Sequence, residues 1–219
     1  MKRVIEDDAS TERSARDASA TRSALLEAAA ELFAEKGYGE TSIRDITRRS
    51  GVTSGAVYGH FRNKADLLAE AVNLRTTEEL ESQATVSRAT DYIQTLTRLA
   101  RDYPRRRRLR TLIVQGAAAA QTDSEARALL REEQLSHLKT WLAGYERERV
   151  RLGIDSSVDM EAALLYTWAV ELGLGVLECL DIEPRSRKGW ADIQNRLARS
   201  LQLPPAIDLG SKPRKRRQK

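Results

Sequence analysis

Apolar residues recur along most of the chain at the spacing of one face of an α-helix. The first clear stripe runs from Leu25 to Phe33, and Gly37 follows where a glycine commonly ends a helix. Residues 1–18 mix charged residues with Ser, Thr and Ala but show no apolar period, so we expect a disordered arm there. The pattern predicts that structure begins near Ser19 with an amphipathic helix.

Two short helices are predicted next, on either side of a glycine turn. Ser42 is a good N-cap, and Asp45 three residues later completes a near capping box for a helix that runs to Arg49. Gly51 ends that helix, and Thr53 can cap a second one. The spacing is that of a helix-turn-helix, in which two short helices cross over a small core.

The second short helix has a distinct inner side. Val57 and Phe61 point one way and should anchor the helix, which leaves small and polar side chains on its other faces. A further start signal, Asn63 with Asp66 three residues later, predicts a longer helix that leads out of this first domain.

The rest of the chain also reads as helices separated by turns, with no β-hairpin signal. We expect further helices over about 88–101, 104–121, 123–152, 157–180 and 184–203. The predicted fold class is all-α with about nine helices. We place a three-helix helix-turn-helix domain at 19–66, a helical bundle for dimerisation and ligand binding at 67–203, and a basic disordered tail at 204–219.

Composition agrees with a helical protein. Of the 219 residues, 41% are hydrophobic, 32% are charged and only 5% are aromatic, with many strong helix formers. The net charge of +5 fits a polyanionic partner, but much of the basic excess lies between Ser211 and Lys219. Bulk charge alone is therefore a weak argument for DNA binding.

The location of the protein is predicted from three features. The single Cys179 cannot form an intrachain disulfide, and Met1 to Ala20 lacks the apolar core of a secretory signal. The longest apolar run, Ala162 to Val170, is about half of a membrane span of about 18 residues. We expect a cytoplasmic protein with no membrane partner.

The sequence shows no arrangement of catalytic groups. Its two histidines, His60 and His137, lie in different predicted domains, and no metal-ligand spacing, phosphate loop or nucleophile elbow occurs. We therefore expect no enzyme activity, no metal site and no cofactor.

The second short helix has the residues of a DNA reader. A helix in the major groove reads bases mainly through its N-terminal residues, while hydroxyls, amides and cations around it hold phosphates. The candidate base-reading residues are small or form hydrogen bonds: Thr53, Ser54, Gly55 and Ala56. The candidate phosphate ligands surround them: Thr41, Ser42, Tyr58, His60 and Lys64.

Two of these assignments have structural alternatives, and one has extra support. Tyr58 could pack against the domain core, and His60 could simply lie in solvent. Lys64 follows a helix cap, where a cation is unfavourably placed in the helix dipole, and this favours a functional role.

Residues 22–74 resemble the N-terminal domain of the TetR family of bacterial regulators. The resemblance rests on Ala29-x-x-Leu32-Phe33-x-x-x-Gly37-Tyr38, Thr41-x-Ile43-x-x-Ile46 and Ser50-Gly51-Val52-x-x-Gly55-x-Val57-Tyr58-x-His60-Phe61-x-x-Lys64-x-x-Leu67-Leu68. It covers about a quarter of the chain. Two positions depart from the family pattern: Gly59 replaces a usually larger residue, and Thr47 replaces a small apolar one.

This resemblance implies a ligand-responsive repressor that binds a palindromic operator as a homodimer. A small-molecule effector bound to the C-terminal domain would release the DNA, and the helix near 63–81 would link the two events. By similarity, Thr53 to Ala56 would face bases, while Tyr58, His60 and Lys64 would hold the backbone. The alternative is a helical small-molecule-binding or interaction module without specific DNA binding.

The resemblance also implies a dimer interface made by the last two helices. The helix at 157–180 is the most apolar in the chain, and the last helix has a stripe formed by Trp190, Ile193, Leu197 and Leu201. The alternative is that both stripes belong to an ordinary intrachain core.

An effector pocket in such a bundle would combine aromatic side chains with a few polar ones. The candidates are His137, Trp141, Tyr145, Tyr166, Trp168 and Glu171, each of which could instead be a core residue. The basic segment 212–219 could add nonspecific DNA affinity or be a solvated tail, and Arg22 could reach a minor groove.

Overall fold

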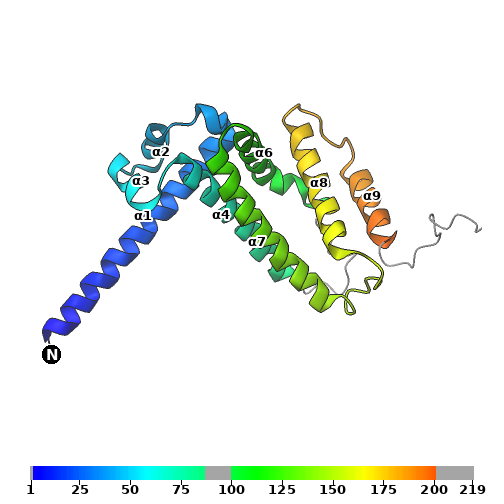
Figure 1. The fold of residues 1–219 in the computed structure, drawn as a ribbon, viewed down its shortest axis with the longest axis horizontal. Coiled ribbons are helices and arrows are strands. Elements are labelled where there is room, and N and C mark those ends of the chain that lie inside the picture. Colours follow the sequence, from blue (N-terminus) through cyan, green and yellow to red (C-terminus); the bar gives the residue numbers. More distant parts are fainter. Residues whose placement is uncertain (1, 87–99, 201–219) are drawn as a thin grey trace, which may run out of the picture.

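The computed structural model describes residues 2–86 and 100–200, and all the regular elements in these ranges are helices. Their order along the chain is α1 (Lys2–Glu40), α2 (Ile43–Ser50), α3 (Ser54–His60), α4 (Lys64–Val86), η1 (Tyr103–Arg106), α6 (Arg107–Thr122), α7 (Ser124–Glu148), α8 (Met160–Glu178) and α9 (Arg187–Ser200) (Figure 1). The all-α prediction is confirmed. Most of the helix expected at 88–101, and the tail expected at 204–219, lie outside the described residues.

Helix α1 starts earlier than the sequence indicated. Residues 2–18 are helical and do not form the expected disordered arm, and this part of α1 projects away from the other helices (Figure 1). A helix that is already nucleated extends at little cost through helix-forming residues, even where it has no apolar face to bury. Gly37 adopts φ 83° and breaks the regular helix where the sequence predicted its end.

The two short helices form as their caps predict. Asp45 N donates to Ser42 Oγ at 3.1 Å and Ser42 N donates to Asp45 Oδ2 at 3.2 Å, which is a complete capping box. Gly51 ends α2 in the left-handed region at φ 71°. Thr53 is the N-cap residue of α3, although its side chain makes no capping hydrogen bond.

A single core joins the helix-turn-helix to the first helices of the bundle. Val57 and Phe61 are 1% and 2% exposed, so α3 is anchored on the side that the sequence predicted. Asn63 Oδ1 accepts a hydrogen bond from Asp66 N at 2.9 Å and begins α4 as expected. The core cluster draws on α1, α2, α3, α4, α6 and α7 and includes Leu25, Leu32, Phe33, Ile46, Val57, Phe61, Leu67, Leu68, Val72, Leu112 and Leu130.

Boundaries in the last third of the chain differ from the prediction by a few residues. Helix α7 ends at Glu148, because the chain then turns through Gly153 at φ 67°. Helix α8 begins at Met160 after the cap Asp159, whose carboxylate accepts from Ala162 N at 3.0 Å. Helix α9 begins at Arg187, so Pro184 lies in the connection ahead of it.

Helix α8 is long and apolar enough to cross a membrane by length and composition alone, with mean hydropathy 1.3 over its most apolar window. The sequence estimate of half a span was therefore too strict. A core helix of a globular protein passes the same test. In this structure, Glu171 and Glu178 of α8 form ion pairs with arginines of η1 and α6.

Candidate nucleic-acid interface

The N-terminal turn of α3 presents small groups to solvent. Thr53, Ser54 and Gly55 are exposed, and Ala56 is half-buried. Because Val57 and Phe61 fix the opposite side of the helix, this surface has a defined orientation relative to the core. The four residues are therefore free to approach another molecule, and their contact with bases stays a prediction.

Tyr58 and His60 flank this surface. Tyr58 is 62% exposed, so the alternative in which its ring packs into the domain core is wrong. His60 is half-buried, with its ring centroid 6.3 Å from that of Phe61. The phenol of Tyr58 is thus available to a phosphate, whereas part of the His60 ring contributes to packing.

Thr41 requires a correction, because its side chain is only 1% exposed. Its hydroxyl donates to the carbonyls of Gly37 at 2.7 Å and Leu32 at 3.2 Å, where it satisfies acceptors at the end of α1. The Thr41 hydroxyl therefore stabilises the turn and is not offered to a phosphate.

The hydroxyl of Ser42 is also engaged, although the residue is exposed. It donates to Asp45 Oδ2 at 2.7 Å while accepting from Asp45 N. The hydrogen bonds from Ser42 lower the pKa of the Asp45 carboxyl. Because Asp45 N is bound by Ser42, the backbone amides of Ile43 and Arg44 are the groups of this helix start that could meet a phosphate.

Lys64 has a structural reason for its position at the start of α4. Its Nζ donates to the carbonyls of Tyr38 at 2.9 Å and Thr41 at 3.2 Å, and it lies 4.3 Å from the centroid of the Tyr38 ring. The ammonium group therefore stabilises the end of α1. A phosphate contact by Lys64 stays a prediction. Lys64 would have to make that contact while keeping its hydrogen bonds to these carbonyl oxygens.

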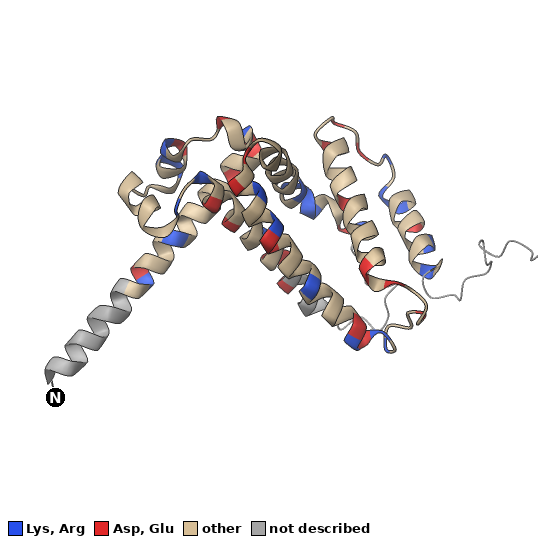
Figure 2. Ribbon diagram, in the orientation of Figure 1, with Lys and Arg blue, Asp and Glu red and all other residues tan. Residues whose placement is uncertain are grey.

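Two arginines of α2 extend the polar surface and were missed by the sequence interpretation. Arg44 and Arg48 are exposed, and the closest carboxylate to Arg48 is that of Asp45 at 3.8 Å. Figure 2 shows basic positions along α2 beside α3. A helical-wheel reading would have found them, because they lie one turn apart, away from buried Ile46.

Arg22, considered above for a minor groove, is engaged in contacts with its own domain although its side chain is 41% exposed. Its Nη2 lies 2.9 Å from Glu70 Oε2, and its guanidinium carbon lies 5.3 Å from the centroid of the Phe61 ring. These contacts tie α1 to α4 and to the end of α3.

A second group of sequence-predicted residues meets between α4, α7 and α8. His137 Nε2 lies 2.9 Å from Asn73 Oδ1, and the ring of Trp141 is 6.4 Å from His137 and 5.7 Å from Trp168. Burial lowers the pKa of His137, which favours its neutral form. The sequence analysis did not identify Asn73, because its partner His137 lies on a helix that is distant in sequence.

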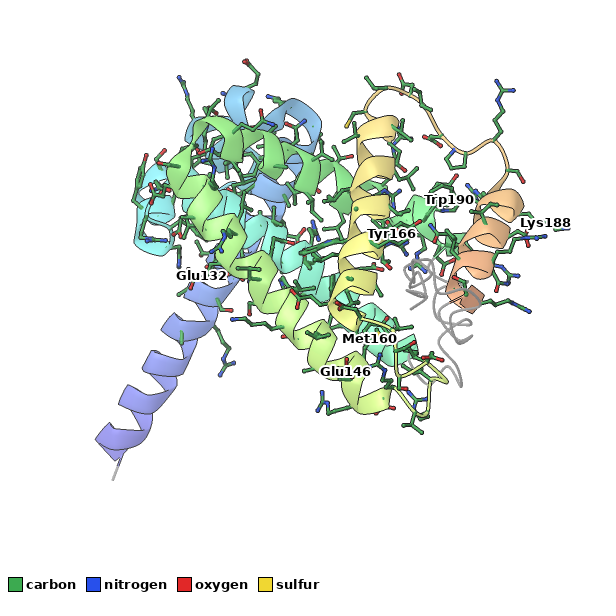
Figure 3. The ribbon with its side chains drawn as sticks, turned by 45° about the vertical axis from the view of Figure 1, so that its right-hand side comes forward. Glu132, Glu146, Met160, Tyr166, Lys188 and Trp190 are labelled. Carbon is green, nitrogen blue, oxygen red and sulfur yellow. The ribbon has the colours of Figure 1, made fainter. Side chains whose placement is uncertain are left out.

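Two other candidates for an effector pocket, Tyr145 and Tyr166, lie elsewhere. Tyr145 packs on the small cluster of Leu152, Ile154 and Met160, and burial raises the pKa of its phenol. Met160 lies where the connection from α7 meets the start of α8 (Figure 3). Tyr166 is 56% exposed on α8, so it is a surface residue in the described structure and not a pocket residue.

Glu171 is also corrected, because it is part of a buried ionic cluster between α8, η1 and α6. It pairs with Arg106 at 2.8 Å and Arg110 at 3.1 Å, while Arg110 also binds Glu178 at 2.9 Å. The side chains of Arg110 and Glu178 are 3% and 2% exposed. Buried charges need such partners, so Glu171 is a structural residue of this cluster.

The outer surface of α8, α9 and the connection between them has a concentration of apolar side chains. At least two-fifths of each of these residues is exposed: Leu165, Tyr166, Val176, Leu177, Leu180, Ile182, Ile193 and Leu197. We call this set the outer apolar face. Trp190, expected in the same stripe, is half-buried with its ring 6.2 Å from that of Tyr103, and Leu201 lies outside the described residues. Figure 3 labels Tyr166 on α8 and Trp190 on α9.

Comparison with known proteins supports the helix-turn-helix. Residues 25–71 match the family of bacterial regulatory proteins described as the tetR family. Over 72 residues the chain is 40% identical to the HTH-type transcriptional regulator AcrR of Shigella flexneri, covering 31% of this chain and 34% of that protein. Over 59 residues it is 41% identical to the HTH-type transcriptional repressor KstR2 of Mycobacterium tuberculosis, covering 27% and 30%. The match thus spans about a third of the length of these curated relatives.

Solved structures are similar over most of the chain. A TetR-family transcriptional regulator from Rhodococcus sp. aligns with TM-score 0.73 and 19% identity over 84% of this chain and 100% of that one. The regulator FadR from Bacillus subtilis, solved with stearoyl-CoA, aligns with TM-score 0.64 and 18% identity over 80% and 96%. At these identities the likeness shows a shared fold.

Proposed function

Because residues 25–71 match the tetR family of bacterial regulatory proteins and the whole fold is similar to that of TetR-family structures, we propose that the chain is a cytoplasmic, ligand-responsive transcriptional repressor of this family. The observation that carries this proposal is the exposed N-terminal turn of α3, held by two buried anchors and flanked by the exposed ring of Tyr58. Small residues let the backbone approach base edges, and the tyrosine hydroxyl can hold a phosphate.

The proposed oligomer is a homodimer that binds a palindromic operator. The side chains of the outer apolar face are each at least two-fifths exposed, and a second copy of α8 and α9 would bury them. A two-fold dimer places two copies of α3 in successive major grooves, which calls for an operator with the same symmetry.

The proposed effector site is the junction of α4, α7 and α8 around His137, Trp141 and Trp168. The stearoyl-CoA complex of FadR supports the presence of a ligand site in this fold, but low identity gives no reason to transfer that ligand. A coupling free energy of about 1–3 kcal/mol between effector and DNA would change operator affinity by about 5- to 150-fold.

The test is an operator titration with Tyr58→Ala at fixed salt, after an operator has been selected from genomic fragments. We expect about 5- to 150-fold weaker binding, the equivalent of about 1–3 kcal/mol, with the variant still folded and dimeric. Lys139→Ala, at an exposed position of α7, is the control and should leave the affinity unchanged. Wild-type affinity in Tyr58→Ala would contradict the assignment.

The alternative, an interaction module without specific DNA binding, makes an opposite prediction. Such a module would show no preference for any duplex over random competitor DNA at physiological salt. The exposed turn of α3 beside Tyr58 favours the repressor, because a module of that kind has no need for this combination of residues.

A further inference from the structure

Helix α7 contains a buried carboxamide with no hydrogen-bond partner. Both Nε2 and Oε1 of Gln134 are buried, and neither has a partner among the residues that the structure describes. Buried polar atoms in proteins are nearly always paired, so an unpaired donor beside an unpaired acceptor calls for another molecule to satisfy them. This residue could not be singled out from the sequence, because glutamine is common on exposed helix faces.

Gln134 lies on the side of α7 that faces the interior. One turn before it, Leu130 lies against Gly116 of α6, where an added Cβ would be 3.3 Å from Leu130 Cδ1. One turn after it, His137 binds Asn73 of α4, and a further turn on, Trp141 packs against Trp168 of α8. Residues three, four and seven apart share one helix face, so the carboxamide belongs to the surface that meets these three helices.

The described charged side chains of the bundle do not offer a free charge to a ligand at this position. Burial, followed by repulsion from Glu70, raises the pKa of the Glu133 carboxyl next to Gln134, which favours its neutral form. Arg106 and Arg110 are paired with Glu171 and Glu178, and burial favours the neutral form of His137. A charged ligand group at Gln134 would lose its hydration without gaining an opposite charge from these residues. A neutral group with a donor next to an acceptor would instead match both atoms of the carboxamide.

We propose that Gln134 is the polar anchor of the effector site and that the effector is an uncharged aromatic compound with a carboxamide-like donor and acceptor. Its amide pairs with Nε2 and Oε1 of Gln134, and its ring packs near Trp141 and Trp168. The regulatory meaning of this site rests on the proposed function, whereas the binding itself does not.

The experiment compares three probes that share one ring: benzamide, benzoate and benzylammonium. Binding to the full chain is measured without DNA, by calorimetry and by the change in tryptophan fluorescence. We expect benzamide to bind at least about tenfold more tightly than either charged probe, as a matched buried polar pair requires. Equal or tighter binding of a charged probe, or no detectable binding of benzamide, overturns the inference.

Variants separate an anchor from a structural residue. Gln134→Leu and the more flexible Gln134→Met should lower benzamide affinity at least about tenfold and raise the unfolding temperature, because an unpaired buried amide is removed. Gln121→Leu, at an exposed position of α6, is the matched control and should change neither quantity. Unchanged benzamide affinity in the Gln134 variants contradicts the proposal.

Two further outcomes distinguish this inference from the proposed function. A Gln134→Leu variant that is no more stable, together with a wild-type protein that ignores benzamide, would mean that buried water satisfies the carboxamide, and the inference would fail. Benzamide binding that depends on Gln134 in a protein without specific DNA affinity would support the site while refuting the repressor.

Discussion

The helix-turn-helix core and the outer apolar face have the same kind of sequence pattern and opposite environments. In the first region, Leu25, Phe33 and Ile46 are fully buried by neighbouring helices of the same chain. In the second, Leu180 is 65% exposed and Ile193 is 56% exposed. Apolar periodicity thus indicates which face of a helix is suited to burial. It does not indicate whether the surface that covers this face belongs to the same chain.

The helix-turn-helix is joined to the start of α7 through polar contacts at one end of the bundle. Tyr38, at the end of α1, donates to Asp123 Oδ2 at 2.8 Å, and Asn63 Nδ2 donates to Glu125 Oε1 at 2.9 Å. Asp123 is also the N-cap of α7, with its carboxylate accepting from Ala126 N. A movement of α7 would therefore displace groups that bind the start of α4 and the end of α1.

The largest predicted effect is on the buried side of this comparison. Phe33→Ala removes a ring that is 0% exposed and should lower the free energy of unfolding by about 3–5 kcal/mol. Denaturant titration at several protein concentrations measures it. The loss should be the same at every concentration, and Tyr166→Ala on the outer apolar face should instead show a concentration-dependent loss.

A charge placed on the outer apolar face should separate the dimer. Leu177→Glu buries a carboxylate without a partner in the proposed interface, and we expect dimer dissociation to become at least about 100-fold easier. Sedimentation equilibrium measures the change. Leu135→Glu, at an exposed leucine of α7, is the control. A Leu177→Glu protein that stays as dimeric as the control would refute the proposed interface.

The hydrogen bond between Tyr38 and the cap of α7 should contribute less to stability. Tyr38→Phe removes only the hydroxyl that binds Asp123, so stability should fall by about 0.5–1.5 kcal/mol. Burial, followed by the hydrogen bond to Asp123, raises the pKa of this phenol, which agrees with a hydroxyl kept protonated as a donor. Tyr58→Phe, which alters an exposed hydroxyl, should leave the unfolding free energy unchanged.

The smallest effect is a dependence of stability on pH from His137. Burial lowers its folded-state pKa below the ordinary 6.5, so the unfolded chain binds the proton more strongly. The contribution of neutral His137 to the free energy of unfolding is complete above pH 6.5. It is lost as pH falls from there through the folded-state pKa. Unfolding free energies measured on both sides of this range should show a weaker slope in His137→Gln. An identical slope in the variant would contradict the assignment.

Features determined by neighbouring residues were predictable from the sequence. The capping box of Ser42 and Asp45, the left-handed turn at Gly51 and the Asn63 cap each depend on atoms within four residues. The burial of Val57 and Phe61 followed from the same local spacing. Short-range hydrogen bonding therefore accounts for most of the helix-turn-helix.

Features that depend on a distant partner were not predictable in this way. A threonine hydroxyl can face a phosphate or cap the preceding helix, and only the folded turn shows that Thr41 does the latter. Glu171 resembled a polar pocket residue until Arg106 and Arg110 were brought beside it. Tyr166 is exposed because a different side of α8 packs on α6. Tertiary contacts determine which side of the helix packs.

The central claim is that two copies of α3 read DNA as a symmetric pair. The most direct test is selection of duplexes from a random library by the full chain at physiological salt, followed by measurement of how many chains bind each selected duplex. The account predicts an inverted repeat whose half-sites lie about one helical turn apart, roughly 10–10.5 base pairs or a whole multiple of it, occupied by an even number of chains. Failure to enrich any sequence, or a single asymmetric site bound by one chain, would contradict it.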